Sequence, residues 1–222
     1  MPYKKTLICL ANSRKESGRC VAGLELNGSA LGGWIRPVSK REKEELSIDD
    51  RRYDDGSDIS VLDIVRITFL RQKPHSCQRE NHLIDDSVSW ERIGRAKPAS
   101  LLPAAHQDGT LWINGYSSFN GTNDRIRLTD ADKLSTSLTL VAPMTSTFQV
   151  LKGLSKRQVR LDFKHAGAPY CLAVTDTKLE AAYLAKPDGR YPLTTQALVC
   201  VSIGEEYNGY RYKLAAAVIP LT

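Results

Sequence analysis

Three cations lie close together near the N-terminus, in a polar segment between two apolar runs. Arg14, Lys15 and Arg19 fall within six residues, and Trp34 and Arg36 follow shortly after. In an extended strand, Trp34 and Arg36 share one face. An aromatic ring beside a guanidinium suits single-stranded nucleic acid, because a base stacks on the ring and arginine pairs with a phosphate. We predict a nucleic-acid-binding surface here; the alternative is a core tryptophan with solvated cations.

A second polar segment, residues 74–82, carries several kinds of reactive side chain. Its histidines and cysteine match no standard zinc spacing, and a cysteine nucleophile needs a base and an orienting group that sequence neighbours seldom supply. We therefore expect no metal, no cofactor and no catalytic residue. Amide and guanidinium groups pair with base edges but also tie loops down. Gln78, Arg79 and Asn81 are thus predicted either to contact a ligand or to order the fold.

A third group is the basic run that follows residue 151. Lys156, Arg157 and Arg160 are spaced closely enough to follow a phosphate backbone, and Lys156 and Arg160 face the same way in a strand. The alternative is that this run is only a solvated face. We predict that these residues extend the nucleic-acid contact into the C-terminal half.

The sequence lacks the short motifs of common enzyme classes. It has no P-loop, no GxGxxG after a strand, no HExxH and no GxSxG. Its acidic pairs, Asp54–Asp55 and Asp85–Asp86, fall in loop-like segments, whereas a nuclease needs carboxylates that converge on a metal ion. An enzyme is therefore not the leading interpretation.

The elements that must position these groups are strands. Apolar residues recur with a period of two, in short runs separated by Gly, Pro, Asn and Asp. In 61–70, one face carries Asp63, Val65, Ile67 and Phe69. We predict strands at 6–11, 19–26, 33–38, 61–70, 138–141, 147–151, 159–163, 170–176, 197–203 and 212–219.

Helical patterns are few and short. A helix is expected at 177–184, with a capping residue at Asp176 or Thr177. Residues 39–46 are polar and strongly helix-forming, with opposite charges four residues apart. Asn208–Gly209 is a strong hairpin signal. Further turns of helix are predicted at 98–105 and 130–134. Many short strands with few helices indicate an all-β chain of barrels or sandwiches.

The length allows one large domain or two small ones. The strands fall into two groups, and Ala142-Pro143-Met144 is a plausible hinge because proline cannot donate to a sheet ladder. We predict a first domain over residues 1–135 and a second over residues 136–222.

Composition narrows the class of protein. The 222 residues are 41% hydrophobic and 25% charged, which is ordinary for a folded chain. No apolar run is long enough to span a membrane, and the N-terminus does not resemble a signal peptide. A net charge of +6 favours a polyanionic partner. Five cysteines without a C-x-x-C pair indicate a reduced, cytoplasmic setting.

Several segments resemble a family of bacterial proteins, the dual OB-containing domain proteins. The strongest are Cys9–Gly23, which contains Asn12-Ser13-Arg14-Lys15, and Gly33–Ser39. The likeness continues at 62–65, 78–82 and 212–214. It implies two OB-like β-barrels in tandem with a few short helices, and a nucleic-acid-binding role in prokaryotic antiviral or mobile-element systems. It implies no established catalytic residues.

The sequence therefore predicts a non-enzymatic protein that binds nucleic acid, single-stranded or in a structured form. The first alternative is a sensor that holds a nucleotide or modified base in a pocket lined by Trp34, Arg36, Gln78 and Asn81. The others are a metal-dependent nuclease and a protein–protein adaptor that uses the acidic middle of the chain.

Overall fold

The computed structural model describes residues 1–221 and divides the chain into two compact units. The first unit covers Met1–Ser100, and the second begins at Leu101. This division lies earlier than the expected boundary between residues 135 and 136. The segment 101–135 joins the second unit because its strand β7 (Arg125–Arg127) pairs with β14 (Tyr210–Pro220).

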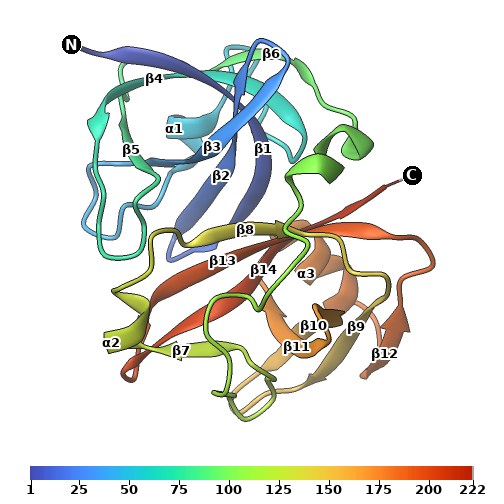
Figure 1. Ribbon diagram of the computed structural model, residues 1–222. Coiled ribbons are helices and arrows are strands. Elements are labelled where there is room, and N and C mark those ends of the chain that lie inside the picture. The colour runs from blue at the N-terminus through green and yellow to red at the C-terminus, as the bar shows by residue number, and fades with distance from the viewer. Residues whose placement is uncertain (222) are drawn as a thin grey trace. The chain divides into compact units, whose positions relative to one another are not determined.

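The first unit is built from strands that Figure 1 colours blue to green. They are β1 (Tyr3–Lys15), β2 (Gly18–Asn27), β3 (Ala30–Val38), β4 (Asp63–Gln72), β5 (Asn81–Ile84) and β6 (Glu91–Arg95). The pairings run β1-β2-β3-β5-β4, and β4 pairs again with β1. These strands therefore form a closed cycle in which β3 and β5 run parallel.

The second unit repeats the order of these strands, and Figure 1 colours its strands yellow-green to red. Besides β7 and β14, they are β8 (Leu138–Val141), β9 (Ser146–Lys152), β10 (Arg157–His165), β11 (Ala168–Val174), β12 (Gly189–Pro192) and β13 (Ala197–Tyr207). The order is β12-β9-β10-β11-β14-β13-β8, and β11 is parallel to β14. The expected hinge, residues 142–144, lies in the connection between β8 and β9 and therefore within the second unit.

Alternation of side chains explains how each sheet covers a core. Along β4, Asp63, Val65, Ile67 and Phe69 are buried while their neighbours are partly exposed, which confirms the predicted face. The core of the second unit is built in the same way, from inward-facing residues of β9, β10, β11, β13 and β14. The all-β fold class is therefore confirmed.

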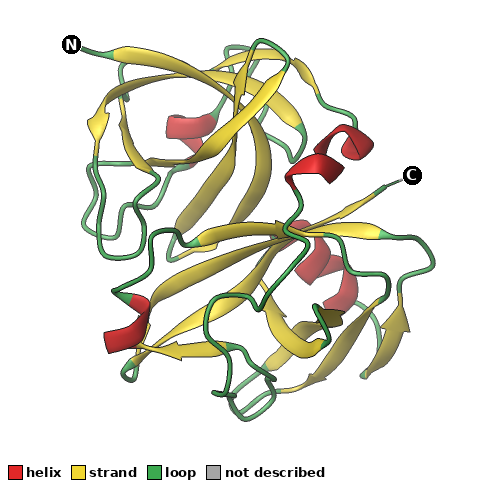
Figure 2. Ribbon diagram, viewed as in Figure 1, coloured by secondary structure: helices red, strands yellow, loops and turns green. Residues whose placement is uncertain are grey.

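Helix is limited to short segments, which Figure 2 colours red. They are α1 (Ile48–Arg51), a 3-10 turn η1 (Pro98–Ala104), α2 (Leu128–Ala131) and α3 (Thr177–Leu184). The Asp176 side chain caps α3 by accepting hydrogen bonds from Lys178 N and Leu179 N, as expected. No helix in the described part of the chain has both the length and the apolar character that a membrane crossing requires.

The helix predicted at residues 39–46 is wrong. Ser39 Oγ donates to Glu45 O at 2.7 Å and accepts from Arg41 N at 3.1 Å, so a serine side chain organises a turn. Glu44 also has a positive φ of 60°, outside the helical region. Local side-chain bonds to the backbone compete with helix formation, and here they replace it.

Candidate functional site

The N-terminal cations gather at the turn between β1 and β2. Arg14 lies opposite Arg19 in the antiparallel register, and Lys15 lies opposite Gly18. Arg14 is exposed, whereas Lys15 and Arg19 are partly buried. Arg19 Nη1 also donates to Gly18 O at 3.2 Å. The sequence thus placed three cations on one hairpin end, and the structure brings them together.

Trp34 and Arg36 differ in exposure. Trp34 is partly exposed on β3, but Arg36 is only 2% exposed and pairs with the buried carboxylate of Glu80 at 3.5 Å. A phosphate contact through Arg36 would require this internal ion pair to open. Arg36 is therefore placed to hold β3 against the segment that leads into β5.

Residues 73–80 form the connection between β4 and β5, and their polar groups turn inward. Asn81 Nδ2 donates to Gln78 Oε1 at 3.1 Å and to Glu44 Oε2 at 3.2 Å, and both amides are buried. Lys73 Nζ lies 2.7 Å from Glu44 Oε1. Arg79, in contrast, is exposed. These contacts support the alternative in which Gln78 and Asn81 order the fold.

The basic run of the second unit also divides between exposed and internal positions. Lys156 is exposed at the β9–β10 turn. Arg157 donates to Leu184 O and Lys186 O at 2.9 and 2.6 Å and pairs with Asp188 at 2.8 Å, so its guanidinium caps the C-terminal end of α3. Such a cap satisfies helix carbonyls that lack a partner within the helix.

Arg160 is 5% exposed, and its guanidinium faces a segment that comes before β7. Its Nη2 donates to Asp124 Oδ2, and to Cys171 O at 2.9 Å. Asp124 is 1% exposed, and a buried charge of this kind is stable only when it is paired. Arg160 therefore anchors a loop rather than presenting a charge to solvent.

That loop, residues 116–124, is shaped around the Asp124 carboxylate. Ser118 N donates to Asp124 Oδ1 at 2.7 Å, and Ser118 Oγ donates to Oδ2. A Cβ on Gly121 would lie 1.9 Å from Asp124 Oδ2, so only glycine fits there. Thr122 then pairs with Cys171 through both backbone hydrogen bonds, which attaches the loop to β11.

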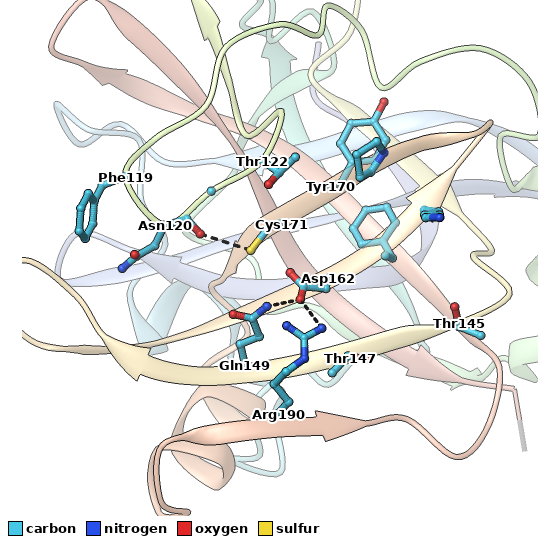
Figure 3. A pocket seen from close by; sticks show the side chains of 14 residues that line it. Phe119, Asn120, Thr122, Thr145, Thr147, Gln149, Asp162, Tyr170, Cys171 and Arg190 are labelled. Atoms are coloured by element: carbon cyan, nitrogen blue, oxygen red, sulfur yellow. Dashed lines mark hydrogen bonds and ion pairs between the residues drawn. The ribbon is translucent and has the colours of Figure 1, made fainter.

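A pocket of about 700 Å³ lies between this loop and the outer face of β9, β10 and β11, with β12 at its other side. Figure 3 shows its lining residues. They are Phe119, Asn120, Gly121, Thr122, Thr145, Thr147, Gln149, Asp162, Phe163, Lys164, Pro169, Tyr170, Cys171 and Arg190. Lys164 and Arg190 are its cations and Asp162 is its anion.

The pocket wall combines an exposed aromatic ring with polar groups that hold the loop in place. The Phe119 side chain is 79% exposed at one end of the pocket, and the neighbouring Asn120 Nδ2 donates to Lys152 O at 3.3 Å. Cys171 Sγ donates to Asn120 O at 3.3 Å, and burial raises the pKa of this thiol to about 12. Cys171 thus stays protonated and acts as a hydrogen-bond donor, not as a nucleophile.

A buried lysine supports the same region from within. Lys213 Nζ donates to Ile113 O at 2.8 Å and to Asn114 Oδ1 at 2.9 Å, and it lies 5.4 Å from the centre of the Tyr170 ring. Burial lowers the pKa of Lys213 to about 7. Its position ties the segment before the loop to β14.

Comparison with known proteins identifies the family. The model of the dual OB-containing domain family matches residues 5–218. The chain belongs to this family. Comparisons with curated proteins and with solved structures gave no match.

The family match explains the strand order that the two units share. An OB fold is a five-stranded barrel that binds oligomers on the face of its second and third strands and on the loops between strands one and two and between strands four and five. In the second unit the second and third strands are β10 and β11, so the pocket lies on that face. In the first unit, Arg14, Lys15 and Arg19 flank the loop between strands one and two.

Sequence analysis missed the pocket. Its residues are contributed by a loop and by four strands, and they become neighbours only through the register that places Thr147, Asp162 and Cys171 side by side. Phe119 was missed because it lies in a polar Ser-Ser-Phe-Asn-Gly-Thr segment without periodicity. An isolated aromatic residue in such a loop was the available signal.

The acidic pairs take local structural roles. Asp55 accepts hydrogen bonds from Ser57, and Asp85 accepts them from Ser87, which is the geometry of tight turns. Across residues 1–221, no group of three or more His, Cys, Asp or Glu side chains is arranged to hold a metal ion.

Proposed function

We propose that this dual OB protein binds single-stranded nucleic acid, DNA or RNA, through the pocket face of its second unit, without catalysing a reaction. The observation that carries the proposal is the position of the pocket, on the strand face that OB folds use for oligomers. An exposed aromatic ring and two cations line that face. This is the combination that single strands require.

The contacts expected of a bound strand follow from the side chains present. A base stacks on Phe119, whose ring is exposed without a covering group in the pocket wall. Lys164 and Arg190 lie in the lining. Lys164 attracts the phosphates, while Arg190 pairs with Asp162 at 2.9 Å. Exposed Lys152 and Lys156, on the adjacent β9–β10 turn, extend the positive charge beyond the pocket.

The first unit supplies a second, smaller set of candidate contacts. Arg14, Lys15 and Arg19 lie at its β1–β2 turn, and exposed Arg79 lies in its β4–β5 connection. Both loops are ones that OB folds use for ligands. Of the residues predicted from sequence, Arg36, Gln78, Asn81 and Arg160 act instead as internal supports in this proposal, and exposed Arg157 caps α3.

The test is fluorescence anisotropy with labelled single- and double-stranded DNA and RNA over a range of salt concentrations. We expect single strands to bind more tightly than duplexes, because a paired base cannot stack on Phe119. Phe119→Ala should weaken binding by about 1–3 kcal/mol and leave the salt dependence unchanged, since stacking releases no counterions.

Phe119→Tyr is the matched control, because it keeps a ring at the same exposed position. It should bind like the parent protein, and both variants should melt at the same temperature as the parent. No salt-sensitive binding to any strand type would overturn the proposal. Equal losses in both variants would show that the ring does not stack on a base.

The pocket volume favours one second candidate function, a sensor for a free nucleotide. About 700 Å³ falls within the range of small-molecule sites. Such a sensor would use Phe119 and Arg190 in place of the residues expected from sequence. Tight binding of mononucleotides, with no gain in affinity as the oligonucleotide is lengthened, would favour it.

The family likeness also suggests a biological setting. We infer a role in a prokaryotic antiviral or mobile-element system, in the cytoplasm, as the sequence analysis expects. A genomic neighbourhood without defence or mobile-element genes would count against this setting.

A further inference from the structure

The floor of the pocket contains a carboxylate, which is unexpected on a face that attracts a polyanion. Asp162 lies on β10, in register with Thr147 of β9 and Cys171 of β11, and its side chain is 23% exposed. A negative charge there repels phosphate and lowers affinity for every sequence alike. Its presence is explained if the carboxylate recognises a particular ligand group.

Two neighbours hold this carboxylate by one of its oxygens. Gln149 Nε2 donates to Asp162 Oδ2, and Arg190 Nη2 lies 2.9 Å from the same oxygen. Figure 3 shows both side chains pointing at Asp162 from β9 and β12. Arg190 thus offsets the charge of Asp162. The Cys171 thiol also interacts with this carboxylate, and neither Gln149 nor Arg190 contacts Oδ1.

The same arrangement orients the amide of Gln149. Because its nitrogen end donates to Asp162, its carbonyl oxygen Oε1 is the end directed away from the carboxylate. The pocket floor therefore offers acceptor oxygens from two side chains, Asp162 Oδ1 and Gln149 Oε1. Donors for a ligand carbonyl come from the hydroxyls of Thr145 and Thr147, which also line the pocket.

Nucleobases differ in how many donors they present together. Guanine has an N1–H and an N2 amino group side by side, next to the carbonyl oxygen O6. Adenine and cytosine each place a single amino group beside an acceptor nitrogen, and uracil or thymine places its N–H between two carbonyls. Guanine alone presents two adjacent donors on its Watson–Crick edge, and both can donate to a single carboxylate oxygen.

We propose that this pocket selects guanine, with Asp162 Oδ1 accepting from both N1–H and the N2 amino group while Phe119 stacks on the base. This inference rests on the proposed binding of single strands and adds a base preference to it. Gln149 and Arg190 are positioning residues in this scheme, since they hold the carboxylate in place.

The test compares oligothymidine strands of about 12 nucleotides, within the site size of one OB fold, that carry one central guanine, inosine, adenine or cytosine. A single guanine avoids quadruplex formation, and inosine lacks only the N2 amino group. We expect the guanine strand to bind about tenfold more tightly than the adenine and cytosine strands, the scale of one bidentate base contact. Inosine should lose most of this advantage.

The Asp162→Asn variant provides a second test of guanine selection. It should reduce the ratio of the affinities for the guanine and inosine strands towards one, because the charged acceptor of the N2 amino group is lost. If the variant does not fold, the affinities of the parent protein for the four strands still test guanine selection. Equal affinity for all four bases in the parent would overturn guanine selection and leave single-strand binding intact. No binding of any strand would overturn both.

Discussion

The two units share one strand order but place their polar side chains in opposite ways. In the first unit, Arg36 and Asn81 lie inside, in contact with Glu80 and Gln78. In the second unit, Lys164 and Arg190 line an open pocket on the strand face. The same barrel plan therefore yields one surface whose polar groups bond to each other and one whose polar groups face a cavity.

The connections between strands account for this difference. In the first unit, residues 73–80 link β4 to β5 and fold back over the polar groups. In the second unit, the corresponding link is the tight Asn208–Gly209 turn, with positive φ at both residues, as the sequence predicts. The additional segment, residues 116–124, instead comes before the barrel and forms one wall of the pocket. A pocket thus arises where a loop stands beside a sheet without covering it.

The largest expected effect concerns the buried ion pairs that stabilise the two surfaces. Arg160→Met leaves the Asp124 carboxylate buried without its cation, and Arg36→Met does the same to Glu80. Each change should lower the free energy of unfolding by about 3–5 kcal/mol, measured by urea denaturation. Only Arg160→Met should also weaken strand binding, because Arg160 anchors the wall of the pocket.

Two further variants separate loss of charge from loss of geometry. Arg160→Lys keeps the charge but cannot bond to both Asp124 and the Cys171 carbonyl with one planar group, so its loss of stability should be smaller. Gly121→Ala should disturb the loop directly and mimic the binding defect. Equal binding by the parent and a folded Arg160→Met protein would show that the wall is dispensable.

Much of the fold could be predicted from the sequence because strand alternation is a local signal. Residues 138–141 and 177–184 match the observed β8 and α3. The short strands β5, β6, β7 and β12 were missed. β5 begins with buried polar residues, Asn81 and His82, and β12 has no alternation to detect.

The candidate site was less predictable because burial depends on distant partners. Arg160 has the appearance of a surface cation in the sequence, and its partner Asp124 lies in a loop far from it along the chain. Turn residues such as Arg14 and Lys156 were easier, since hairpin ends are exposed in any β-sheet. The strand register, which brings the lining residues of the pocket together, could not be predicted from the sequence.

The next effect in size is a pH dependence that arises from Lys213 in the second unit. Lys213 has a pKa of about 7 in the folded protein, against about 10.4 in an unfolded chain. Between these values the unfolded state binds more protons, so the free energy of unfolding rises with pH, by at most about 1.4 kcal/mol per pH unit. Below about pH 7 both states are protonated and this contribution is constant.

Urea denaturation of the parent and of Lys213→Met at several pH values between about 7 and 9 checks this dependence. Relative to the methionine variant, the free energy of unfolding of the parent should rise with pH along that slope, because methionine does not titrate. We expect the methionine variant to gain most, relative to the parent, at the lower pH. Two parallel curves would mean that Lys213 keeps an ordinary pKa.

The smallest expected effect separates the contribution of each unit to phosphate binding. Each phosphate neutralised on a single strand contributes about −0.7 to the slope of log affinity against log salt. Lys164→Ala should therefore make the slope shallower by about 0.7, whereas Lys178→Ala, an exposed lysine on α3 outside the pocket lining, should leave it unchanged. Arg14→Ala provides the comparison with the first unit. An equal change in slope means that the β1–β2 turn of the first unit also contacts phosphate. No change means that the second unit binds the strand by itself. An unaltered slope in Lys164→Ala would contradict the path proposed for the strand, because a lysine in the pocket lining cannot contact a phosphate without displacing counterions.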